Sequence, residues 1–226
     1  MNHFYVLEPE KGKLFGIQWA YADLIAPVNR GEYDRCPACG GAVSGLRWIE
    51  PRRVKLSSAK PEKWGDFIWG AGFPLIVSER FKTVYEAERL TGIAEFSLPV
   101  EVTRVGTRKK GDFPALLPDY HLVSVPWGGA NQDDVASEVV HEKPEKIVCA
   151  YCRLGVSWRK QPRIIIEENT WDGSDIFRPR GAPIQFMVSE RFKEVAEAHS
   201  FKNIWLIPSE KYGYDVRRPG LWYIHE

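Results

Sequence analysis

The chain has 226 residues, of which 44% are hydrophobic and 27% are charged, values typical of a globular protein that can bury a core. The 31 Lys and Arg residues nearly balance the 30 Asp and Glu residues, and the resulting net charge of +1 argues against a DNA-coating protein. No segment approaches the ~18 consecutive apolar residues of a membrane-spanning helix, and the first residues lack the pattern of a signal peptide. We therefore expect a cytoplasmic protein that does not cross a membrane.

The first predicted elements surround a Cys-x-x-Cys turn. A strand is expected near residues 4–7, followed by a loop that leads to Cys36 and Cys39. Gly40, directly after this pair, suits the tight turn that a metal-binding knuckle needs. A further strand is expected over residues 53–56, and a loop that carries Gly, Asp and aromatic residues follows it.

A helix is predicted to begin after Ser78. The Ser78 hydroxyl is a good N-cap, and Glu79 is an acid well placed in the first turn. The apolar residues that follow recur at i, i+3 and i+4, as an amphipathic helix requires. A strand over residues 96–102 closes this unit.

Residues 103–148 form a connector with a less regular pattern. We expect a strand over residues 120–125, a Gly-Gly turn at Gly128 and Gly129, and a short acidic helix over about residues 133–142.

The second half of the chain repeats the first. The sequence VSERFK at residues 77–82 recurs unchanged at residues 188–193, and a six-residue identity is unexpected by chance in so short a chain. Cys149 and Cys152 match the first cysteine pair, with Arg153 where the first turn has Gly40. The same element order is therefore expected, with the following members: a strand over 163–167, a helix capped by Ser189, a strand over 204–207, and an edge strand or anchor at 221–224.

These elements predict an α+β fold of two similar knuckle–strand–helix–strand halves, related by a rough twofold axis. We interpret residues 1–226 as a single domain. Its first repeat spans residues 36–102, its connector residues 103–148 and its second repeat residues 149–210.

The four cysteines predict a metal site. Each Cys-x-x-Cys turn supplies two thiolates, and a tetrahedral zinc ion needs four. We expect Cys36, Cys39, Cys149 and Cys152 to bind one structural Zn²⁺ per chain that joins the halves, because four sulfur ligands leave no open position for catalysis. A disulfide framework does not suit the cytoplasm, and a redox pair would be one Cys-x-x-Cys at a helix start. Free thiols are the remaining alternative.

No pattern in the sequence indicates an enzyme. The five histidines lack metal-site spacing, and no nucleophile signature or phosphate-binding glycine loop occurs. We therefore predict no catalytic and no cofactor-binding residues. His121 is expected to pack within a strand, and His199 to lie at the carboxyl end of the second helix, where a cation is favoured.

The repeated Ser-Glu-Arg-Phe-Lys segment has two interpretations. Arg80 and Arg191 could present paired cations to an acidic ligand, or the segment could simply begin a helix. We favour the second, because the segment supplies a cap, a first-turn acid and a core aromatic.

The tryptophans leave a similar choice. Trp64, Trp69 and Trp171 lie in Gly- and Asp-rich contexts, where exposed aromatics could anchor a partner. Core packing is expected for three others, which are Trp48, Trp158 and Trp205.

The paired knuckles, Cys36-Pro37-Ala38-Cys39-Gly40 and Cys149-Ala150-Tyr151-Cys152, together with the VSERFK helix starts, resemble the myxobacterial double-CXXCG motif proteins. The resemblance covers nearly the whole chain, and Arg153 departs from the terminal Gly of the family's motif. It implies an immunity protein in the cytoplasm that binds and neutralises the C-terminal domain of a polymorphic lipoprotein toxin exchanged between neighbouring cells.

Two surfaces are candidates for recognition. If the toxin is a nuclease with a basic face, the acidic stretch over residues 133–145 is the expected contact, through Asp133, Asp134 and Glu138. The competing class is a zinc-knuckle nucleic-acid-binding or regulatory protein, which would use the following basic residues: Arg52, Arg53, Lys55, Arg104, Arg108, Lys109 and Lys110. The balanced net charge argues against this class.

Overall fold

The computed structural model describes residues 2–10, 20–58, 60–71, 75–109, 117–141, 149–153, 158–182, 184–215, 217 and 222–224. The side chains of residues 97, 98, 109, 158, 159, 222 and 223 are not described. Strands and two α-helices occur together, which confirms the α+β class. No helix in the described ranges is long and apolar enough to cross a membrane.

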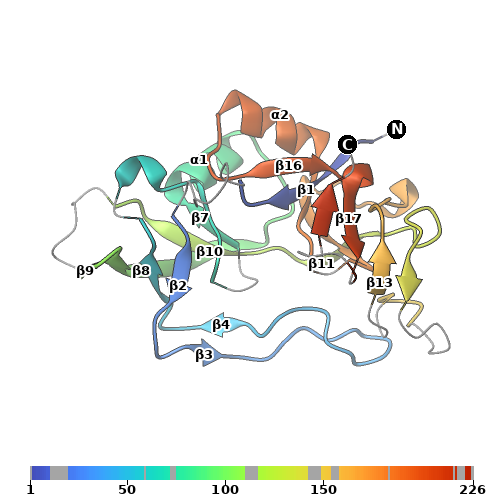
Figure 1. Ribbon diagram of the computed structural model, residues 1–226, viewed down its shortest axis with the longest axis horizontal. Helices are drawn as coiled ribbons and strands as arrows, with labels where there is room; N and C mark the ends of the chain where they lie inside the picture. Colours follow the sequence, from blue (N-terminus) through green and yellow to red (C-terminus); the bar gives the residue numbers. More distant parts are fainter. Residues whose placement is uncertain are drawn as a thin grey trace.

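The chain forms one five-stranded sheet with the order β11-β14-β15-β1-β16 and one with the order β2-β5-β8-β10-β7-β6, with β9 paired to β8 (Figure 1). A four-stranded sheet with the order β12-β13-β17-β18 and the β3-β4 pair complete the described strands. The elements are β1 (Phe4–Glu8), β2 (Ala22–Leu24), β3 (Asn29–Arg30), β4 (Trp48–Ile49), β5 (Arg53–Leu56), η1 (Pro61–Lys63), β6 (Phe67–Ile68), β7 (Leu75–Ser78), α1 (Glu79–Ala87), β8 (Glu95–Val105), β9 (Arg108–Lys109), β10 (Tyr120–Ser124), β11 (Trp127–Asn131), β12 (Val140–His141), β13 (Trp158–Gln161), η2 (Glu168–Thr170), β14 (Ile176–Arg180), β15 (Met187–Ser189), α2 (Glu190–Ala198), β16 (Trp205–Pro208), η3 (Ser209–Lys211), β17 (Tyr212–Asp215) and β18 (Trp222–Ile224).

The two larger sheets exchange their central strands. β1 lies between β15 and β16, far along the chain, with Phe4 opposite Ser189. β10 lies between β7 and β8, which precede it, with Tyr120 opposite Ser78. β1 comes before the first cysteine pair in the sequence but joins the strands next to α2, and β10 comes before the second pair but joins the strands next to α1. Each sheet therefore depends on both parts of the chain.

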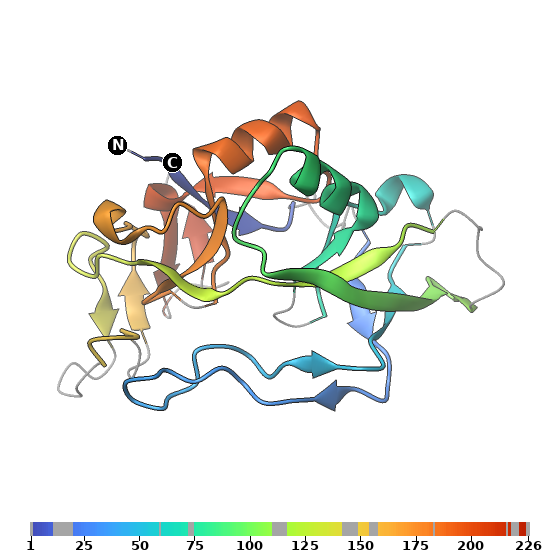
Figure 2. The same cartoon turned by 180° about the vertical axis from the view of Figure 1, so that it is seen from behind.

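The two helices begin as predicted. The Ser78 hydroxyl accepts a hydrogen bond from the Phe81 N–H, and the Ser189 hydroxyl accepts one from the Phe192 N–H. Both phenylalanines are fully buried, and their ring centroids lie 6.3 Å apart in one core cluster. The helices lie together above the sheets in both views (Figures 1 and 2).

The two repeated arginines bind within the molecule. Arg80 pairs with buried Asp66 at 2.6 Å and also donates to the His199 carbonyl, at the end of α2. Arg191 pairs with buried Asp175 at 2.7 Å and donates to the Glu88 carbonyl, at the end of α1. Each arginine thus caps the carboxyl end of the other helix, which agrees with the structural interpretation of the repeated segment.

Several predicted elements differ from those observed. The expected acidic helix is wrong: the Asp133 carboxylate caps a first turn by accepting the N–H groups of Val135 and Ala136, but residues 134–138 form turns that end where Glu138 takes a left-handed φ of +54°. The Val139 N–H then donates to the Asp134 carbonyl, which closes the segment after one turn. The expected Gly-Gly turn is wrong as well, since Gly128, with φ of +100°, lies within β11.

The strand expected over residues 163–167 is also misplaced. β13 lies earlier in the chain, and Ile166 makes only an isolated bridge to Gln132. The strands expected in the other parts of the chain are present, including β1, β5, β8, β10, β16 and β18.

The tryptophans correct two expectations. Trp48 is buried as expected, but Trp205 is 37% exposed rather than in the core, and the side chain of Trp158 lies outside the described residues. Trp64 is buried, and the indole N–H groups of Trp69 and Trp171 donate to the backbone carbonyls of Asn203 and Ser174, so these three rings are not free anchors.

Candidate metal centre

The first cysteine pair lies at the tip of a long arm. β3 and β4 form its stem, and the segment between them runs beneath the body toward the second cysteine pair in both views (Figures 1 and 2). Between residues 28 and 50, only Cys36, Val43 and Trp48 are buried. The arm therefore has little core of its own, and its position depends on contacts at the two ends.

The first Cys-x-x-Cys segment forms a tight turn. The Cys36 N–H donates to the Gly41 carbonyl at 2.8 Å, and the Gly40 N–H donates to the Cys36 carbonyl at 2.9 Å. Gly40 has φ of +71°, a left-handed conformation that glycine adopts without steric cost. The sequence predicted this use of the glycine.

The second turn has the same backbone shape with a different residue. Arg153, the counterpart of Gly40, has φ of +57°, and its N–H donates to the Cys149 carbonyl at 2.7 Å. Its guanidinium pairs with Glu167 at 2.9 Å and donates to the Gln132 carbonyl. These contacts hold in place a conformation that costs a non-glycine residue about 1–2 kcal/mol.

The two turns bring all four sulfur atoms together. They lie within 4.8 Å of one another, with 4.0 Å between Cys36 and Cys149 and 3.8 Å between Cys39 and Cys152. A tetrahedral ion with sulfur ligands at about 2.3 Å places those sulfurs about 3.8 Å apart. The donor set therefore fits one metal ion, and each close pair joins the arm to the second half of the chain.

The backbone around the cluster favours thiolates at two positions. Hydrogen bonding from the Cys152 backbone lowers the pKa of Cys149 to about 7. Burial raises the pKa of Cys36, but hydrogen bonds from the backbone of Cys39 and Ala38 outweigh it, so the net pKa is lowered. Hydrogen bonding from the Gly41 backbone lowers the pKa of Cys39, but side-chain hydrogen bonds with Cys36 and Cys149 outweigh it, so the net pKa of Cys39 is raised. Thiolates are the metal-binding form of cysteine, so the lowered pKa values of Cys36 and Cys149 favour a cation at the cluster.

Side chains from the second half hold the tip of the arm. Val43 and Trp127 pack against the cysteines, and Arg178 donates to the Val43 carbonyl at 3.1 Å. Arg180 lies 4.1 Å from the centre of the Tyr151 ring and donates to its hydroxyl at 3.0 Å.

His121 and His199, the two histidines whose positions the sequence predicts, each lie within hydrogen-bonding distance of a carboxylate. His121 lies in β10, and its Nε2 is 2.5 Å from a Glu79 oxygen. His199 follows α2 as expected, with its Nε2 2.7 Å from a Glu88 oxygen. Over the described ranges, the four cysteines are the one group of potential metal ligands that comes together.

The acidic stretch makes internal contacts where it is described. Asp133 caps the turn at residues 134–138, and Glu138 pairs with Arg163 at 2.8 Å. Burial raises the pKa of Asp134. Residues 142–145 of the stretch lie outside the described ranges.

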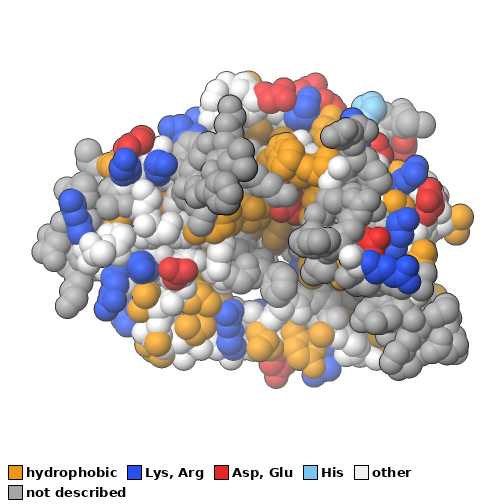
Figure 3. Space-filling model, in the orientation of Figure 1, with side chains coloured by type: hydrophobic (Ala, Val, Ile, Leu, Met, Phe, Trp, Pro, Cys, Tyr) orange, Lys and Arg blue, Asp and Glu red, His pale blue; other side chains and the backbone are white. Residues whose placement is uncertain are grey.

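The basic residues divide into two groups. Arg52 is buried against the Trp48 carbonyl, and Arg53 pairs with Glu101 at 3.1 Å. Strand register brings three others into one row across β5, β8 and β9, and Figure 3 shows Lys and Arg side chains at this end of the molecule. By backbone register, the row consists of Lys55 opposite Arg104 and Arg104 opposite Lys109. Exposed Arg108 lies next to this row in β9, opposite Val105, and Lys110 lies outside the described ranges.

Comparison with known proteins does not assign a family. No protein-family model matches the chain, and the search of curated proteins finds no match.

Proposed function

We propose that the cysteine cluster binds one zinc ion with a structural role. Four thiolates are the donor set that zinc prefers in closed sites, and they leave no position for a substrate. The sulfur spacing supports this proposal, as do the two thiols of lowered pKa. Cys36, Cys39, Cys149 and Cys152 would hold the ion, which would fasten the arm to the second half.

We further propose that the chain is one domain of two related halves with an approximate twofold axis. The exchange of β1 and β10 supports this proposal, as do the matched Arg80–Asp66 and Arg191–Asp175 pairs. The repeats then extend toward the N-terminus of each half, to about residues 4–102 and 120–208, which shortens the connector.

We propose that this protein is a cytoplasmic, non-enzymatic immunity protein that binds and neutralises the C-terminal domain of a cognate toxin. The proposal starts from the family resemblance of the two knuckles and helix starts. The observation that carries it is therefore the pair of matched knuckles in the sequence. The sulfur cluster that closes the arm onto the body is compatible with it, because a cross-linked surface loses little conformational entropy when it binds a protein.

The test is co-expression with the toxin-like domain encoded beside its gene. We expect the intact chain to restore growth and to co-purify with the toxin domain, and Cys36→Ser to do both poorly. Ala38→Ser, an exposed change within the same turn, is the matched control and should protect fully. Growth arrest with well-folded intact chain, and no complex, would overturn the proposal.

A second candidate function is nucleic-acid binding, because strand register places the cations Lys55 and Arg104 opposite each other on β5 and β8. Such a pair suits closely spaced phosphates. It predicts binding to a 20-base-pair duplex that weakens steeply with salt and is lost in Lys55→Glu/Arg104→Glu. Binding that is absent at low salt excludes this function.

A further inference from the structure

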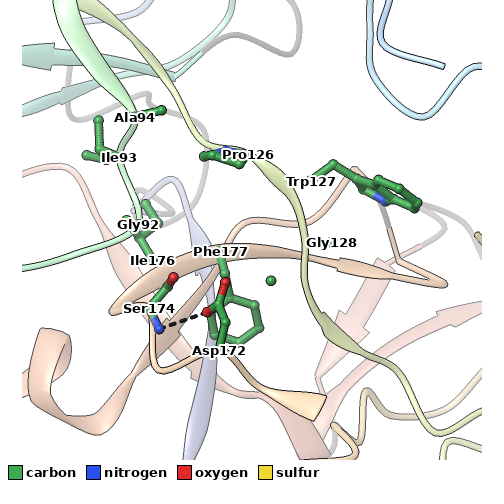
Figure 4. A pocket seen from close by; sticks show the side chains of 11 residues that line it. Gly92, Ile93, Ala94, Pro126, Trp127, Gly128, Asp172, Ser174, Ile176 and Phe177 are labelled. Carbon is green, nitrogen blue, oxygen red and sulfur yellow. Dashed lines mark hydrogen bonds between the residues drawn. The ribbon is translucent and has the colours of Figure 1, made fainter. Parts of the chain in front are cut away.

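A pocket lies where three distant segments meet. It has a volume of about 270 Å³ and is lined by the loop after α1, the segment that enters β11 and the loop before β14 (Figure 4). Ile93 and Pro126 lie on one side, and Asp172, Ser174 and Phe177 on the other. Such a junction between parts of a fold is a common place for a binding site.

The walls of the pocket are close-packed backbone. A Cβ added at Gly92 would lie 1.8 Å from the Ile176 carbonyl oxygen. A Cβ added at Gly129 would lie 2.9 Å from the Cβ of Phe177. Because glycine allows this close approach, the pocket is preformed and a ligand would not have to order it.

One ionisable group lines the pocket. It is the carboxylate of Asp172, an exposed residue, whose Oδ1 accepts the Ser174 N–H at 2.9 Å. A carboxylate can accept about four hydrogen bonds, so Asp172 keeps acceptor capacity toward the pocket. The other lining side chains are mostly apolar, such as Ile93 and Phe177. The site therefore fits a cation carried on an apolar stem.

The volume indicates the size of the occupant. Pockets for drug-sized ligands or cofactors range from about 300 to 1,000 Å³, so this one is suited to a single side chain. We infer that the Asp172 pocket receives a Lys or Arg side chain of a partner protein. This inference rests on the proposed function, because that function supplies a protein partner. The inferred contact with a basic toxin face then lies at Asp172 and not at the acidic stretch over residues 133–145.

The test uses N-acetyl-arginine methylamide as the probe, followed by NMR of the full-length protein. We expect saturable shifts of the Gly128 and Gly129 amides and the Trp127 indole, which border the pocket. The citrulline analogue, which has the same shape without the charge, should bind about 2- to 5-fold more weakly, the effect of losing an ion pair with an exposed carboxylate.

Asp172→Asn should weaken probe binding by the same factor of about 2 to 5, because it removes the charge and keeps the oxygen that accepts the Ser174 N–H. Glu86→Gln, at an exposed position on α1, is the matched control and should leave binding unchanged. Equal binding of the arginine and citrulline probes, or unchanged binding to Asp172→Asn, overturns the inference and leaves toxin protection unaffected. Probe binding that depends on Asp172, in a chain that fails to protect cells, overturns the immunity function alone.

Discussion

The metal cluster gives the most decisive prediction, because the proposed zinc ion would join the tip of the arm to the second half of the chain. Removing the ion with a chelator, or one ligand with Cys36→Ser, should release the arm from the second half. Its β3-β4 stem pairs Asn29 with Ile49 and Arg30 with Trp48, and backbone hydrogen bonds such as that from the Val43 N–H to the Asp34 carbonyl continue this two-stranded hairpin toward the tip. An isolated two-stranded hairpin is marginally stable, so the arm should not keep its position alone.

The size of the effect follows from the chain length that the cross-link spans. Between Cys39 and Cys149 it closes a loop of about 110 residues, for which the loop-entropy model gives a stabilisation of about 4–5 kcal/mol. The loss should approach this value if the ion constrains the unfolded chain as a disulfide would. The lost contacts of Val43 and Arg178 add to it.

The assay combines metal analysis, urea unfolding and limited proteolysis. We expect about one zinc per chain, a fall of about 4 kcal/mol in the free energy of unfolding after chelation, and new cleavage between residues 31 and 47. Cys36→Ser should show the same fall without chelator, and Ala38→Ser should behave as the unaltered protein. A metal-free chain with unchanged stability and no new cleavage would refute the reasoning.

Three further predictions concern other contacts. In urea unfolding, Arg153→Ala should be less stable than Arg153→Gly by about 1 kcal/mol. Both variants lose the ion pair with Glu167, but only glycine adopts the φ of +57° without steric strain. Equal stabilities would show that the turn is unstrained. Asp66→Ala and Asp175→Ala should each cost about 3 kcal/mol, since each removes a buried carboxylate that pairs with a helix-capping arginine, and exposed Glu86→Ala should cost little in the same thermal or urea assay. Burial raises the pKa of Tyr85 from 10.0 to about 12, so its stabilising contribution is complete below pH 10 and is lost as the pH rises toward about 12; a Tyr85→Phe chain should lack this part of the decline in stability measured by urea unfolding.

Local sequence rules identified the parts of the fold that depend on neighbouring residues. Ser78 and Ser189 cap their helices because the cap bond joins residues three apart. The same reasoning failed over residues 134–138, where Asp133 caps a first turn but Glu138, with φ of +54°, ends it at once.

The candidate site shows a similar division. Cysteine spacing predicted both turns, and the repeat predicted that they would meet. The spacing held no sign of the arm or of the Asp172 pocket, because the pocket joins segments around residues 93, 127 and 172 that share no motif.

By itself, the sequence determined the α+β class, the duplicated helix starts and a four-cysteine cluster, because each follows from short-range chemistry or from direct repetition. Only the tertiary structure decided that β1 and β10 exchange sheets and that Arg80 and Arg191 each cap the other helix. A single sequence records which strands can form but not which strands pair, since pairing depends on packing between residues more than a hundred positions apart. The structure also shows where some of the balanced charges lie, since the repeated arginines pair with buried carboxylates.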